Sequence, residues 1–216
     1  MQARRPAAAD RARRSTSGWR SARLHAIRVG FATHIDPCRR FALAPNDEAT
    51  VPLILTLKMD DLSQERFDRL RRAHFPPKRN FLQAHLTLFH HLPGDRTDEV
   101  VATVEEACRQ QQPMSLRAAR LLFMGRGVAY AFDAPELGAL RKRLAEVWEP
   151  WLTPQDRQGF RPHVTVQNTV SAQEARALHE RLEEVFSPFE VVGEGLSLWR
   201  DAGGPWRTVG TYAFQR

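Results

Sequence analysis

The chain has 216 residues, of which 42% are hydrophobic and 26% are charged, an ordinary composition for a globular protein. Its two cysteines are too few for a disulfide-stapled scaffold, and no apolar run approaches the roughly 18 residues that a membrane-spanning helix needs. The net charge of +7 would suggest a nucleic-acid binder if it were spread over the whole protein.

The positive charge is confined to the first part of the chain. Residues 1–46 contain ten Arg and no Lys, against Asp10 and Asp36, so this stretch carries +8 and the rest of the chain −1 of the total of +7. The stretch is rich in Arg, Ala and Ser, and its apolar periodicity is weak, so it is not expected to form a core. We therefore expect a basic, disordered extension over residues 1–48 and a folded domain over residues 49–216.

The role of this extension is left open by the sequence. A solvated tail, a start codon assigned too early, an organelle-targeting segment and a basic arm that contacts RNA phosphates all fit its composition. A secretory signal does not fit, because no apolar stretch follows the basic start. Without a targeting role for this segment, we expect a cytoplasmic protein that does not associate with membranes.

Strand and helix patterns alternate from residue 51 onward. In the first half we expect a strand over 52–57 and a helix that residues 60–63 can cap and that runs to about residue 74. A strand over 81–89 and a helix over 97–111 follow. Strands over 114–124 and 128–132 follow, separated by a turn at residues 125–127.

The same order of elements then recurs in the second half. We expect a helix over 135–148, a strand over 163–167, a helix over 171–186 that opens with a capping box, and strands over 189–199 and 206–214. This divergent internal duplication predicts an α+β fold of two pseudo-symmetric sheet-and-helix lobes rather than one long doubly wound sheet.

One strand in each half carries the same four-residue pattern. The first copy is His85-Leu86-Thr87-Leu88 and the second is His163-Val164-Thr165-Val166. Because side chains alternate between the two faces of a strand, each copy presents an imidazole and a hydroxyl on one face, with two apolar anchors on the other. Two copies at corresponding places in the two halves exceed what chance would give.

These motifs resemble those of the 2H phosphoesterase superfamily, which includes 2′-5′ RNA ligases and cyclic phosphodiesterases. The resemblance covers residues from about 51 to 214 and includes the Pro162 that precedes the second motif. It implies a bilobal fold with a central cleft. It also implies that His85 and His163 are the catalytic residues and that Thr87 and Thr165 bind the substrate phosphate.

The chemistry of cyclic phosphodiester hydrolysis needs a base to activate water and an acid to protonate the departing ribose oxygen. Histidine can fill both roles near neutral pH, and the two hydroxyls can donate to the non-bridging oxygens of the phosphate. With two histidines in these roles, no metal or other cofactor is needed. The sequence does not decide which histidine is the base, or whether hydrolysis or the reverse ligation prevails.

We expect the partner to be RNA or a nucleotide that carries a 2′,3′-cyclic phosphate or a 2′-5′ linkage, and the protein to be a monomer. The alternative is a non-catalytic nucleotide- or RNA-binding module on the same fold. The two intact motifs disfavour that alternative, because a pure binder need not keep two acid–base histidines.

Further residues could contact the substrate. Phe89 continues the alternation of His85 and Thr87 and could stack on a base, although packing against the neighbouring loop is equally compatible with the sequence. Arg126, in a glycine-flanked turn, and Arg161, just before the second motif, could reach a phosphate. His90 and His91 invite a zinc site with His85, but their spacing matches no standard zinc motif.

Overall fold

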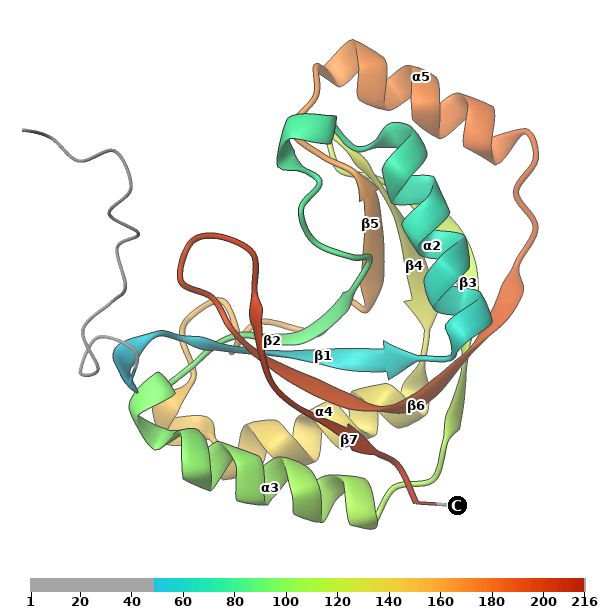
Figure 1. Ribbon diagram of the computed structural model, residues 1–216. Helices are drawn as coiled ribbons and strands as arrows, with labels where there is room; N and C mark the ends of the chain where they lie inside the picture. The colour runs from blue at the N-terminus through green and yellow to red at the C-terminus, as the bar shows by residue number, and fades with distance from the viewer. Residues whose placement is uncertain (1–48, 216) are drawn as a thin grey trace, which may run out of the picture. The chain divides into compact units, whose positions relative to one another are not determined.

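The computed structural model describes residues 49–215 (Figure 1). The basic extension expected over residues 1–48, together with its Arg cluster, lies outside the described residues. The helices and strands follow one another in this order: β1 (Leu53–Met59), α2 (Asp61–His74), β2 (Leu86–Leu92), α3 (Thr97–Arg109), β3 (Met114–Phe123), β4 (Val128–Asp133), α4 (Pro135–Val147), β5 (His163–Gln167), α5 (Ala172–Glu183), β6 (Phe189–Arg200) and β7 (Arg207–Ala213).

The expected α+β order of elements is confirmed, and both helix caps form. The Asp60 carboxylate accepts the backbone N–H of Ser63 at the start of α2. At the start of α5, the Ser171 hydroxyl and the Glu174 carboxylate form a reciprocal capping box. Each cap satisfies backbone donors that have no partner inside the first helical turn.

The strand expected over residues 81–89 begins later, at Leu86. The backbone before it bonds elsewhere, because the N–H of Ala84 donates to the Asp68 carboxylate of α2 at 2.6 Å. The segment before the first motif is therefore held by a helix rather than by a neighbouring strand.

The seven strands form one antiparallel sheet in the order β1-β2-β5-β4-β3-β6-β7, and β1 also pairs with β6. The long strand β6 bonds to β3 through residues 189–193 and to β1 through residues 193–200, so it runs through both halves of the sheet. At the other junction, β2 and β5 meet through the single residue pair Leu86 and Val164. The two motif strands are therefore neighbours.

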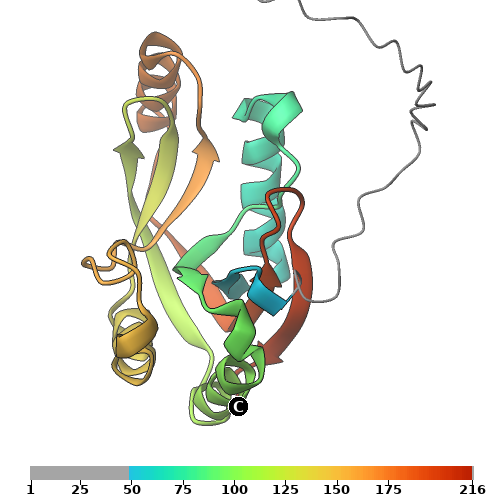
Figure 2. The ribbon, with the colours of Figure 1, turned by 90° about the vertical axis from the view of Figure 1, so that its left-hand side faces the viewer.

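The helices cross between the halves. Helix α2, from the first half, packs against β5 of the second half, and Phe67 contacts the ring of Tyr130 edge-on at 5.4 Å. Trp148, which ends α4 in the second half, contacts Phe89 of β2 at 5.0 Å. Figure 2 shows α4 and α5 at opposite ends of β3 and β4. The two lobes are therefore interlocked.

Two arginine side chains add hydrogen bonds between a helix of one half and a motif strand of the other. Arg71 of α2 donates to the backbone oxygen of Thr165 at 3.0 Å, and Arg141 of α4 donates to the backbone oxygen of Leu88 at 3.1 Å. Arg71 is only 4% exposed, so its charge is fixed within the fold. Each motif strand is thus bonded to a helix of the other half.

The apolar residues of both motifs are buried in the core, as the alternation predicts. The anchors are at most 1% exposed, and they are Leu86, Leu88, Val164 and Val166. Burying such side chains contributes roughly 1.5–3 kcal/mol each, which fixes both motif strands in the sheet.

Asp60 joins α2 to β6, and this predicts a pH-dependent contribution to stability. Burial alone would raise the pKa of Asp60, but bonds from Ser63 and Val192 outweigh it and lower the pKa below 3.8. We expect Asp60→Ala to lower the free energy of unfolding at pH 7 by about 1 kcal/mol. Because a lowered carboxyl pKa stabilises the fold only above the unfolded value, the difference should shrink as the pH falls below 3.8.

Urea unfolding of both proteins at pH 7 and at pH 3.5 measures this difference. The exposed Asp61, one residue further on, is the matched control, and Asp61→Ala should not reproduce the effect. An Asp60→Ala loss that stays the same at both pH values would show that its carboxylate charge is not involved.

Candidate active site

The Leu86–Val164 pair sets the geometry of the candidate site. The strands are antiparallel, so a step forward along β2 matches a step back along β5. His85 therefore falls beside Thr165, and Thr87 falls beside His163. Residues directly opposite in such a pair point to the same face of the sheet, and the four polar side chains form a group with approximate twofold symmetry.

The backbone orients both imidazoles in the same way. Nδ1 of His85 lies 2.8 Å from the carbonyl oxygen of Gln83, and Nδ1 of His163 lies 2.8 Å from that of Arg161. A carbonyl oxygen only accepts hydrogen bonds, so Nδ1 carries the hydrogen in each ring. Nε2 of each histidine is then the atom that can accept or donate a proton.

The two motifs line one pocket of about 220 Å³. Six of its nine lining residues are polar, and the full set is Ile54, His85, Thr87, His90, Met124, His163, Thr165, Asn168 and Trp206. The structure therefore brings the four expected motif residues together. A pocket of this size and chemistry can hold a phosphate group with an imidazole on either side.

Each motif strand contains an irregularity just after its threonine. On β2, Thr87 pairs with Thr56 and Phe89 with the adjacent Leu55, so Leu88 is an additional residue. On β5, Thr165 pairs with Ala129 and Gln167 with the adjacent Val128, so Val166 is additional. Such bulges shift the alternation of side chains by one position.

The bulges exchange the residues that face the pocket. Phe89 is fully buried in the core against Trp148, so its expected stacking on a base is wrong. Its counterpart Gln167 is 8% exposed. His90 and Asn168, the next residues along the two strands, line the pocket instead. Strict alternation fails here because each strand contains an additional residue just after its threonine, and β2 has a second irregularity between Phe89 and Leu92.

Neither of the two candidate arginines lies among the residues that line this pocket. Arg126 donates to the backbone oxygen of Val170 at 3.1 Å and ties the β3–β4 turn to the segment before α5. Arg161 is exposed, and its backbone oxygen rather than its side chain serves the site by bonding to His163.

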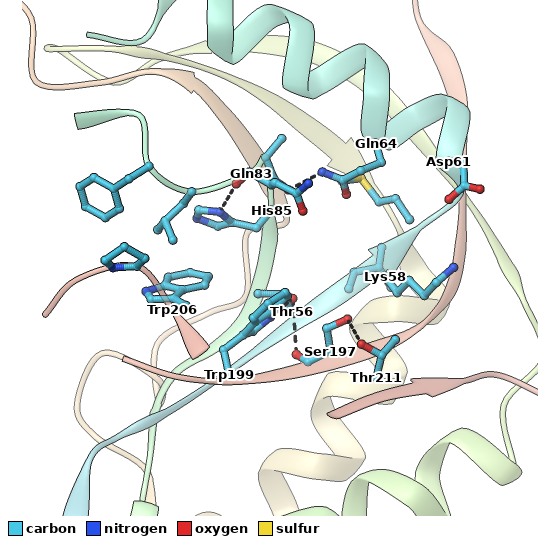
Figure 3. Close-up of a pocket in the computed structure, with 16 residues that line it drawn as sticks. Thr56, Lys58, Asp61, Gln64, Gln83, His85, Ser197, Trp199, Trp206 and Thr211 are labelled. Carbon is cyan, nitrogen blue, oxygen red and sulfur yellow. Dashed lines mark hydrogen bonds between the residues drawn. The ribbon is translucent and has the colours of Figure 1, made fainter. Parts of the chain in front are cut away.

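Trp206 makes the surroundings of the two histidines unequal. Its ring, in the loop between β6 and β7, lies 4.7 Å from the ring of His85 (Figure 3). Burial lowers the pKa of His85 to about 4, and the charge of Arg71 adds to this effect, although the bond to Gln83 opposes it. His85 is therefore neutral at pH 7.

A second pocket, of about 380 Å³, shares His85 and Trp206 with the first. Trp199 contributes an aromatic ring to its lining, and Gln64 and Gln83 contribute amides (Figure 3). Phe81 contributes a further aromatic ring. Phe81 is 56% exposed, so its ring is accessible to a ligand. Aromatic faces with amides beside them suit a planar heterocycle.

Two findings concern the described residues as a whole. Within residues 49–215, no three His, Cys, Asp or Glu side chains lie close enough to hold a metal ion. None of the helices in this range is long and apolar enough to cross a membrane.

Four residues line the pocket although the sequence did not predict them to contact substrate: Ile54, His90, Met124 and Asn168. For Trp206 the sequence left two roles open, stacking on a base or packing between the lobes. Trp206 comes from a distant hairpin, and no sequence pattern connects it with His85. His90 and Asn168 do leave a signal, because each is the fifth residue after its motif histidine. That spacing places both residues on the pocket side of the sheet, however, only because each strand contains a bulge.

The interlocked α+β fold and the paired His-x-Thr strands define a two-histidine class of protein. Residues 59–205 match the family model described as the 2′-5′ RNA ligase superfamily. The chain belongs to this superfamily, which confirms the resemblance to 2H phosphoesterases that the motifs indicate.

Solved structures share the fold. TT0787 of Thermus thermophilus is 16% identical, with a TM-score of 0.52, over 76% of this chain and 97% of its own. E. coli LigT complexed with 3′-AMP is 17% identical, with a TM-score of 0.51, over 77% of this chain and 99% of its own. No curated protein matches the chain.

The burial of Phe89 yields a test of its role. Phe89→Ala removes a ring from the core beside Trp148 and is expected to lower the free energy of unfolding by about 3–5 kcal/mol. Denaturant unfolding measures the loss, and the exposed Phe81 provides the control, since Phe81→Ala should cost little. A Phe89→Ala protein of unchanged stability would place this ring outside the core.

Removal of Trp206 should change the ionisation of His85. Trp206→Ala admits water to the imidazole, so the pKa of His85 should rise from about 4 toward 6.5. NMR titration of the histidine ring protons measures this, with His85→Ala used for assignment. Trp151, which lies under Arg96 and outside both pockets, is the control. An unchanged pKa in Trp206→Ala would show that other groups desolvate His85.

Proposed function

We propose that this protein is a metal-independent phosphoesterase that acts on 2′,3′-cyclic phosphates or 2′-5′ phosphodiester bonds of RNA or nucleotides. The observation that carries the proposal is the pseudo-symmetric pairing of His85 and His163 across one phosphate-sized pocket, with Nε2 free on both rings. Membership in the 2′-5′ RNA ligase superfamily supports it.

The difference between the two histidines supports an assignment of their roles. His85 is neutral at pH 7, so its Nε2 can take a proton from water while the water oxygen bonds to phosphorus. His163 then donates a proton to the ribose oxygen as the phosphorus–oxygen bond breaks. The products are a phosphomonoester and a free ribose hydroxyl. With a 5′-hydroxyl in place of water as the nucleophile, the same steps open the cyclic phosphate, form a 2′-5′ linkage and release the ribose 3′-hydroxyl.

Thr87 and Thr165 complete the proposed machinery. Each hydroxyl stands beside the histidine of the opposite strand, where it can donate to a non-bridging phosphate oxygen as negative charge develops. Both strands are anchored by buried apolar residues, which fix the backbone positions of the two threonines.

The pocket beside Trp206 supports a nucleotide substrate. It opens from His85 and offers aromatic rings within reach of a ribose whose cyclic phosphate lies between the histidines. Stacking of a base on an aromatic side chain contributes roughly 1–3 kcal/mol, so a nucleoside should bind better than a bare cyclic phosphate.

We also propose that the catalytic domain is confined to residues 49–216 and does not need the basic extension over residues 1–48. This is supported by the family match, which begins at residue 59, and by the pocket, whose lining comes from residues 54–206.

The direct test is turnover of a panel of 2′,3′-cyclic nucleotides and cyclic-ended RNA, with and without EDTA. His85→Ala and His163→Ala should each reduce kcat/KM by about 10²–10⁴-fold, since each removes one proton transfer. Thr87→Ala and Thr165→Ala should cost about 10–100-fold through one charge-assisted hydrogen bond.

EDTA should leave the rate unchanged, and the acid limb of the wild-type pH profile should reflect the pKa of His85 near 4. Arg126→Ala, which alters a residue outside the pocket, is the control and should retain activity. Wild-type turnover by a His85→Ala/His163→Ala double variant would overturn the mechanism. Ligand binding without turnover would favour a non-catalytic module.

A further inference from the structure

A third imidazole faces the catalytic pocket. The bulge on β2 turns His90 to the side of the sheet that bears His85 and Thr87. The corresponding bulge on β5 turns Asn168 to the same side. The pocket therefore has three positions from each strand rather than two, and the third position differs between the strands.

His90 is held by a buried carboxylate. Asp156, which is 1% exposed, accepts the backbone N–H groups of His90 and His91 at 2.8 and 3.0 Å. Nδ1 of His90 lies 3.3 Å from Oδ1 of the same carboxylate. Thr153 and Arg141 also bond to Asp156, through its side chain and its backbone oxygen respectively.

This arrangement fixes the His90 ring. Burial would raise the pKa of Asp156, but the bonds from His90 and His91 outweigh it, so the pKa is lowered and the residue is a carboxylate at neutral pH. A carboxylate accepts the Nδ1 hydrogen, which leaves Nε2 of His90 for the pocket. Nε2 can then share a proton with an oxygen of a phosphomonoester bound in the pocket.

We propose that His90 is a third substrate-binding imidazole, which donates to an oxygen of a phosphomonoester in the catalytic pocket, and that Asp156 is its positioning residue. The proposal rests on the phosphoesterase function proposed above. Unlike the roles of His85 and His163, it does not follow from the His-x-Thr motifs.

The role proposed for His90 follows from the number of non-bridging phosphate oxygens in the substrate and in the product. A cyclic phosphodiester has two non-bridging oxygens, which Thr87 and Thr165 can bind. Ring opening by water produces a monoester with a third non-bridging oxygen and additional negative charge. His90 supplies a third donor on the side of Thr87, and it should therefore strengthen binding of the product and of inorganic phosphate more than binding of the cyclic substrate.

Binding of inorganic phosphate and of adenosine 2′-monophosphate by calorimetry tests this without turnover. His90→Ala should raise the Kd of both by about tenfold or more, as expected for loss of a hydrogen bond to a charged group. It should change KM for a 2′,3′-cyclic nucleotide less. His91→Ala is the matched control, because His91 is exposed, lies outside the pocket and shares only a backbone bond with Asp156.

A double-variant cycle separates positioning from a structural role of Asp156. Asp156→Asn should weaken phosphate binding in the wild-type background but not further in His90→Ala, whereas a structural role would weaken both. Equal phosphate affinity in His90→Ala and wild type would overturn the proposal. If the wild type binds phosphate through His90 but cleaves no cyclic phosphate, the proposed function fails and the binding role stands.

Discussion

The pairing of Leu86 with Val164 is the contact on which the site depends. Both residues are fully buried, and they form the single pair that joins β2 to β5. Because this pair lies at the centre of both motifs, it places each histidine beside the threonine of the opposite strand. A shift of register by one residue would turn the polar side chains of one motif toward the core. The packing of these two apolar residues therefore determines which polar side chains meet on the opposite face of the sheet.

The symmetry of the motifs is broken by what surrounds them. The two Nδ1 atoms have equivalent carbonyl partners, but Trp206 and Arg71 act on His85. The two bulges are also equivalent, yet one presents an imidazole and the other an amide. A duplicated framework supplies matched positions, and a few unmatched side chains give the two ends of the pocket different properties.

Much of the fold could be predicted from local patterns. The helix cap within residues 60–63, the capping box at Ser171 and the alternation within the two four-residue motifs each depend on near neighbours in the chain, and all are observed. The start of β2 and the face of Phe89 were predicted wrongly, because they depend on Asp68 and on a bulge defined by another strand. The position of Trp206 depends on a hairpin more than a hundred residues from His85, beyond any local pattern.

The exchange of helices between the halves bears on how such a protein folds. Helix α2 packs on the second motif strand, and the helix end at Trp148 packs on the first. A single half would leave an apolar strand face uncovered, so neither half is an independent folding unit. Each motif strand is therefore covered only when a helix from the other half of the chain is in place, so the two strands that carry the histidines are stabilised together.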